Sequence, residues 1–162
     1  MPPMMPPGGG YAMAAPGNLA SRGMRIVGGL IDVVILVVIN GIIGIIFISA
    51  GDARPSSFGV IPGHIVGVAV VLSVVIDVAY FAYFWSSRGA SIGMMPFGFK
   101  VRDVATGQYP TLGKAALRSF IWALEVGFTI CIIGAIGWLW QLWDPQKQAI
   151  HDKIAGTIVT TS

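Results

Sequence analysis

The chain has 162 residues, of which 55% are hydrophobic and only 10% are charged. Soluble domains contain about 25% charged residues, so this composition excludes an ordinary soluble domain and indicates an integral membrane protein. The net charge of +3 arises from basic residues in the short segments between apolar runs. They form no basic stripe interleaved with aromatic residues, which argues against nucleic-acid binding.

Residues 1–19 are predicted to be a disordered tail rich in proline and glycine. The first 18 residues hold five Pro and four Gly and no charged side chain, a composition typical of low-complexity segments. They lack the basic start and the apolar stretch of a cleavable signal peptide. We therefore expect one membrane domain over residues 20–162.

Three apolar runs are each long enough to cross a bilayer as a helix, which takes about 20 residues. The runs cover residues 26–50, 65–85 and 120–143. The sequence thus predicts an all-α membrane protein with three transmembrane helices. Lys and Arg favour the cytoplasmic side of short loops. With three spans, seven of the ten basic residues share the side of the N-terminus, so we expect a cytoplasmic N-terminus and an external loop over residues 51–64.

The loop over residues 86–119, expected in the cytoplasm, contains a short β-like segment. In the segment FKVRD, Lys100 and Arg102 alternate with apolar residues, which is the period of a strand. Thr111 is expected to cap the helix that follows. Near the C-terminus, QKQAIHDKIAG is predicted to be a short helix and TIVTT a strand.

The two predicted strands conflict with three spans. TIVTT would naturally pair with FKVRD, but three spans place these segments on opposite sides of the membrane. In the alternative, residues 120–143 form a re-entrant hairpin broken near Gly134 and Gly137, and only two helices cross. On the sequence alone three spans are favoured, and the hairpin stays open as the second interpretation.

Each apolar run contains one acidic residue: Asp32, Asp77 and Glu125. A carboxylate inside a span is costly in hydrocarbon and normally faces a partner or a water-filled cavity. At about 1.5 Å per residue, the three acids lie roughly 9, 12 and 7 Å from the same membrane face. This coincidence predicts one intramembrane polar site. The alternative is that each acid simply joins neighbouring helices.

Arg25 is the predicted partner of Asp32. The two residues lie seven positions apart, which puts them on one face of a helix. They are nevertheless about 10.5 Å apart along the axis. Arg25 would therefore meet Asp32 through water, or pair with an acid on another helix.

Three segments resemble the RDD family of bacterial membrane proteins, which is named for one Arg and two Asp. The first is Arg25, then IVGGLI, then Asp32. The second is GASIGMMPFGFKVRD, where Met94 stands in place of a frequent Lys, and the third is WDPQKQAIHDKIAGT, which carries Asp152. The resemblance covers residues 20–161 and implies that Arg25, Asp32 and Asp152 are the signature residues. A Pro/Gly-rich tail before such a domain is similar to an actinobacterial arrangement.

Asp152 lies outside the apolar runs, so we expect it to make a structural contact. It can start a helix, or it can form an ion pair with a basic residue of the 86–119 loop, such as Arg88 or Arg102. The second option requires a cytoplasmic C-terminus and therefore the re-entrant hairpin. With an external C-terminus, the partner would instead be Lys147 or Arg54.

Two functions are expected for this protein of the cell membrane. In the first, which the family resemblance also suggests, it is linked to the transport of cations or protons through its intramembrane acids, as a homo-oligomer. In the second, it is an accessory or scaffold subunit of a larger membrane complex, without flux of its own. No enzyme activity or cofactor is expected, because the sequence has no Walker-type loop or nucleophile elbow. No metal site is expected either, because His151 and Asp152 have no further His or Cys beside them.

Overall fold

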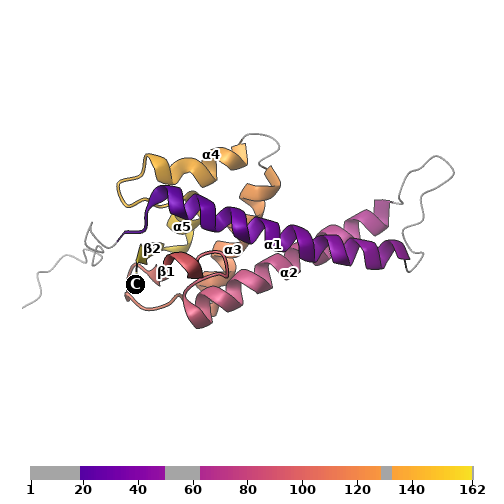
Figure 1. Ribbon diagram of the computed structural model, residues 1–162, viewed down its shortest axis with the longest axis horizontal. Coiled ribbons are helices and arrows are strands. Elements are labelled where there is room, and N and C mark those ends of the chain that lie inside the picture. The colour runs from indigo at the N-terminus through magenta and orange to yellow at the C-terminus, as the bar shows by residue number, and fades with distance from the viewer. Residues whose placement is uncertain (1–18, 50–62, 129–132, 162) are drawn as a thin grey trace, which may run out of the picture.

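The computed structural model describes residues 19–49, 63–128 and 133–161, which form helices and one small sheet (Figure 1). Two long helices come first, and shorter elements follow. In chain order the elements are α1 (Arg22–Ser49), α2 (Gly63–Arg88), the 3-10 turn η2 (Met95–Phe97), β1 (Phe99–Asp103), α3 (Leu112–Gly127), α4 (Ile133–Leu139), the 3-10 turn η4 (Trp140–Leu142), α5 (Ile150–Ala155) and β2 (Thr157–Thr161).

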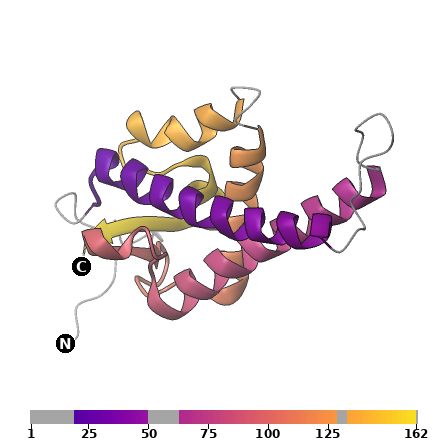
Figure 2. The same cartoon turned by 45° about the vertical axis from the view of Figure 1, so that its right-hand side comes forward.

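Helices α1 and α2 are both long and apolar enough to cross a membrane, as the first two apolar runs predict. Only 11% of the residues in the most apolar window of each helix are buried, so neither is the core helix of a soluble domain. The C-terminal half of α1 and the N-terminal half of α2 extend beyond the other elements (Figures 1 and 2). Their exposed Val and Ile side chains are suited to lipid.

The single helix expected over residues 120–143 does not form. Helix α3 already ends at Gly127, and the separate helix α4 begins at Ile133; the two helices run in different directions (Figure 2). Helix α4 lies against α3 and α1, where a Cβ on Gly137 would come within 3.1 Å of a Glu125 oxygen, and one on Gly29 within 3.0 Å of Trp138. These close approaches favour the hairpin over one straight helix.

The two predicted strands form and pair with each other, as the alternative interpretation with a hairpin allows and the favoured three spans do not. β1 and β2 form an antiparallel two-stranded sheet in which Val101 lies opposite Val159. Along β1, residues 99, 101 and 103 are buried while Lys100 and Arg102 are half-buried, which is the period of two expected from the sequence. The hydroxyl of Thr111 also accepts the Lys114 N–H, as expected for the cap of α3. The pairing therefore places the FKVRD and TIVTT segments side by side.

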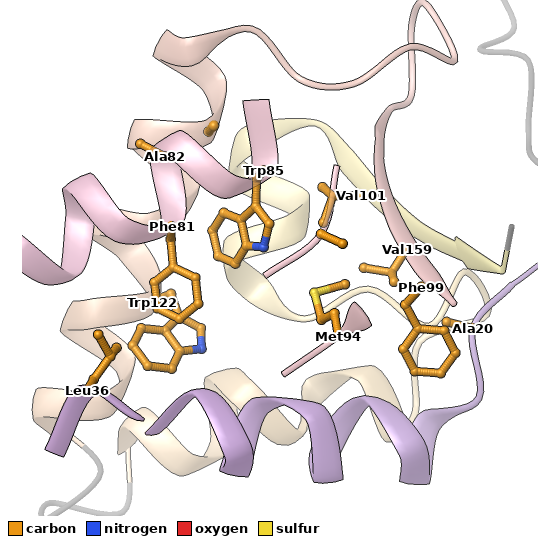
Figure 3. Packing of buried hydrophobic residues seen from close by; sticks show 12 residues of the cluster. Ala20, Leu36, Phe81, Ala82, Trp85, Met94, Phe99, Val101, Trp122 and Val159 are labelled. Atoms are coloured by element: carbon orange, nitrogen blue, oxygen red, sulfur yellow. The ribbon is translucent and has the colours of Figure 1, made fainter. Parts of the chain in front are cut away.

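The apolar core lies where α2, α3 and the sheet meet. The ring of Phe81 stacks on Trp85 and meets Trp122 edge-on, with 4.5 Å between ring centres in both pairs. Figure 3 shows these rings beside Met94 and Val101. This core holds the C-terminal half of α2 to the shorter elements and thereby positions the polar groups described next.

Candidate functional site

Asp152 is the centre of a buried ion-pair cluster that joins three helices. Its Oδ2 lies 2.5 Å from Arg25 Nη2 of α1, and its Oδ1 lies 2.6 Å from Arg118 Nη2 of α3. The Asp152 side chain is 0% exposed, and those of Arg25 and Arg118 are only 7% and 3% exposed. One carboxylate on α5 therefore joins α1 to α3, although Arg25 and Arg118 are far apart in the sequence.

The start of α5 explains how Asp152 is positioned. Asp152 is the third residue of this helix, and its Oδ2 accepts the N–H of Ala149 at 3.1 Å. This contact satisfies a donor that the first turn leaves free. The hydroxyl of Thr157 donates to Oδ1 at 3.4 Å. The expected helix-start role of Asp152 is thus confirmed.

The ion-pair partners of Asp152 differ in part from those expected. Arg118 belongs to the 86–119 segment, as the cytoplasmic alternative requires, but Arg88 and Arg102 do not pair with Asp152. The other partner is Arg25, for which pairing with an acid on another helix was one of two expectations. Arg118 was missed as a partner, although a sign was present: Arg118 and Glu125 lie seven residues apart on the buried face of α3.

The two guanidinium groups hold Asp152 in its charged form. Burial by itself raises the pKa of a carboxyl group. Here the attraction of Arg118 and then of Arg25 outweighs burial and holds the pKa of Asp152 well below its ordinary value. Arginine stays protonated at neutral pH, so both ion pairs are present there.

Glu125 and His151 form a second buried pair between α3 and α5. Glu125 Oε2 lies 2.6 Å from His151 Nδ1, and Oε1 accepts the backbone N–H of His151 at 3.1 Å. Gly137 of α4 passes directly over this carboxylate. Glu125 therefore fixes the position of α5 next to the residue that carries the Asp152 cluster.

The carboxylate of Asp32, on α1, binds the segment that follows α2. It accepts hydrogen bonds from the Ser91 hydroxyl at 2.5 Å, the Gly93 N–H at 2.8 Å and the Tyr80 hydroxyl at 2.9 Å. A Cβ on Gly93 would overlap the carbonyl oxygen of Gly28. The two backbones therefore touch, and only glycine fits this approach.

Asp77 has a different partner again. Its Oδ1 accepts a hydrogen bond from Asn40 Nδ2 at 3.0 Å, which joins α2 to α1. Asp32, Asp77 and Glu125 thus bind three separate sets of groups. Among the described residues, no hydrogen bond or ion pair links one of these acids to another.

A small cavity of about 40 Å³ lies beside the Asp152 cluster. Arg25, Asp32, Arg118 and His151 line it together with aromatic residues. The volume has room for a few water molecules. Arg118 Nε and Nη1 and Gln141 Oε1 have no hydrogen-bond partner in the described part of the chain. The cavity is thus polar on one side, and the signature residues Arg25 and Asp32 both reach it.

The described residues contain no group of three or more His, Cys, Asp or Glu that could hold a metal ion. His151 and Asp152, adjacent in sequence, are both used in the ion pairs above. The pairs of Asp152 and Glu125 hold α1, α3 and α5 together.

The fold and cluster define a class: a helical membrane protein in which buried arginine–carboxylate pairs join the first helix to the C-terminal segment. The chain belongs to the RDD family, whose sequence model matches residues 19–156. Arg25, Asp32 and Asp152, the three residues expected to carry the family signature, are all buried in the structure.

Curated relatives include two mycobacterial proteins. The chain is 35% identical over 78 residues to the proline-rich antigen of Mycobacterium leprae, covering 48% of this chain and 29% of that protein. Identity to the proline-rich antigen homolog of Mycobacterium tuberculosis is 33% over 78 residues, 48% of this chain and 30% of that one. An uncharacterized protein of Rickettsia prowazekii is 32% identical over 90 residues, 56% of this chain and 47% of that protein. The chain spans less than half the length of these relatives, and no solved structure matches it.

Proposed function

We propose that this RDD protein is a non-enzymatic subunit that assembles with other helices inside the cell membrane. Two helices, α1 and α2, cross the bilayer. The α3–α4 hairpin does not cross it and stays on the same side of the membrane as the β1–β2 sheet. Nine of the ten basic residues then lie on one side, because Lys147 and Lys153 join the seven already there and only Arg54 stays opposite. By the positive-inside rule, that side and the N-terminus are cytoplasmic.

The observation that carries this proposal is the Asn40–Asp77 pair. Asp77 lies near the middle of the Gly67–Arg88 span, and both side chains are only half-buried within the chain. A polar pair at this depth that faced acyl chains would be costly. Polar side chains in a span commonly hydrogen-bond to a neighbouring helix. A second copy of the chain is the partner that we propose.

The test is the oligomeric state in mild detergent and in nanodiscs, measured by light scattering after size exclusion. Wild type and Asp77→Asn, which keeps a polar side chain, should both form oligomers, whereas Asp77→Leu should shift towards monomer. Val75→Leu changes an exposed apolar residue two positions away and is the matched control. A wild type that is monomeric in all media contradicts self-assembly. Its co-purification with a larger membrane protein would instead favour an accessory subunit.

A second candidate is a role in cation or proton transport. The observation in its favour is the polar cavity, where Asp32 lies among Arg25, Arg118 and His151. Liposomes containing the purified protein should then show an ion or proton flux that Asp32→Asn abolishes while the protein stays folded. Absence of flux from wild-type liposomes that hold intact oligomers would remove this candidate and leave the assembly role.

A further inference from the structure

Three cationic residues lie at the end of α2. The side chains of Lys100 and Arg102 lie over the Tyr109 ring, and the guanidinium group of Arg88 lies 5.7 Å from the centre of the Phe84 ring. Lys100 Nζ lies 5.8 Å from the centre of the Tyr109 ring, and Arg102 Cζ lies 5.9 Å from it. Arg88, the last residue of α2, accepts a hydrogen bond from Lys100 Nζ at its carbonyl oxygen, 3.0 Å away. The tyrosine ring covers Gly89, where a Cβ would overlap it. We call Arg88, Lys100, Arg102 and Tyr109 the α2-end patch.

The cations of this patch have no carboxylate partner in the described part of the chain. Two other exposed cations differ in this respect, because Lys114 pairs with Asp103 and Lys153 with Asp144. Each patch cation keeps free donors: Lys100 uses one on Arg88, and Arg102 uses one on the Gly107 carbonyl. The patch therefore carries three positive charges that the described residues do not neutralise.

The position of the patch places it at the membrane surface. Arg88 is the last residue of the second candidate span, so the patch lies where that helix leaves the hydrocarbon. Tyr109 is 40% exposed there, and tyrosine favours the headgroup level. Cations next to a membrane helix attract anionic lipids, and each is worth roughly a fivefold gain in binding.

We propose that the α2-end patch binds the phosphate headgroup of an anionic phospholipid of the surrounding membrane. The guanidinium groups of Arg88 and Arg102 supply paired N–H donors for phosphate oxygens, and Lys100 adds a point charge. The tyrosine ring lies beneath Lys100 and Arg102. The proposal rests on α2 crossing the membrane, but it is independent of self-assembly and of transport.

Native mass spectrometry of the protein released from nanodiscs tests this binding. The nanodiscs contain phosphatidylcholine with a minor fraction of phosphatidylglycerol, two lipids that differ in headgroup charge. Wild type should retain phosphatidylglycerol preferentially, and Lys100→Gln with Arg102→Gln should lose about thirtyfold of that preference. The control, Lys114→Gln with Lys153→Gln, removes the same charge from carboxylate-paired positions and should retain the lipid. Inorganic phosphate in the buffer should not displace it.

The conservative variant Lys100→Arg with Arg102→Lys separates charge from folding. It should retain phosphatidylglycerol like wild type, and circular dichroism should show the same helix content for every variant. Equal retention of both lipids by wild type would overturn the proposal. So would equal losses in the patch variant and the control, because the attraction would then depend only on net charge. Displacement by inorganic phosphate would assign the patch to a soluble anion instead.

Discussion

Replacing Asp152 by Asn is predicted to destabilise the protein strongly. The substitution keeps an oxygen that can accept the Ala149 N–H at the start of α5, but it removes the negative charge. Arg25 and Arg118 then remain almost fully buried, with side chains 7% and 3% exposed, and Asp152 no longer offsets their mutual repulsion. The cost comes mainly from these two buried cations.

The magnitude follows from the burial of the cluster. Removing one partner of a buried ion pair costs about 3–5 kcal/mol. For a chain of this size each kcal/mol lowers the melting temperature by about 2–4 °C, so the loss should be roughly 6–20 °C. Thermal unfolding in detergent, followed by circular dichroism or intrinsic tryptophan fluorescence, measures it.

An ion pair with an exposed cation provides the comparison. Lys153→Gln removes the partner of Asp144 where the lysine side chain is 44% exposed. The Asp144 carboxylate keeps the N–H donors of Gln146 and Gln148, so the substitution should cost only about 1 kcal/mol. If Asp152→Asn is as mild as Lys153→Gln, the cluster does not hold α1, α3 and α5 together and the reasoning is refuted. If Asp152→Asn leaves stability unchanged and abolishes a measured flux, Asp152 belongs to a working site instead.

Two further predictions concern pH and topology. Because the folded-state pKa of Asp152 lies below its ordinary value, its ion pairs contribute fully above about pH 4 and are lost as the pH falls further. On acidification below that point, the melting temperature of wild type should therefore drop more than the melting temperature of Asp152→Asn. An equal drop in both proteins would contradict this prediction. In a Cys131→Ser background, an impermeant thiol reagent should label Ser56→Cys in intact cells but label Thr106→Cys only after permeabilisation; the reverse pattern would overturn the orientation.

Local sequence patterns were sufficient to predict several elements. The apolar runs at residues 26–50 and 65–85 correspond to α1 and α2, because length and hydrophobicity alone make a membrane helix. The alternation in FKVRD predicted β1, and Thr111 predicted the start of α3. The motifs around Arg25, Asp32 and Asp152 also indicated the family that the comparison shows.

The partners of the charged residues were not predictable in the same way. Depth along a helix suggested that Asp32, Asp77 and Glu125 share a site, but depth does not specify which helix face a side chain occupies. In the structure Asp32 binds the Ser91–Gly93 segment, Asp77 binds Asn40, and Glu125 binds His151. These contacts depend on how α1, α2, α3 and α5 are rotated against each other.

The sequence by itself determined the class of this protein, its two long membrane helices and its two strands, because each follows from local hydrophobicity and periodicity. Only the tertiary structure decided that residues 120–143 divide into α3 and α4. Close contacts of Gly137 with Glu125 and of Gly29 with Trp138 favour this division, and the second contact joins residues that are far apart in the chain. The same holds for Asp152: its place at the start of a helix is a local property, whereas its pairing with Arg25 and Arg118 exists only because folding brings three distant helices together.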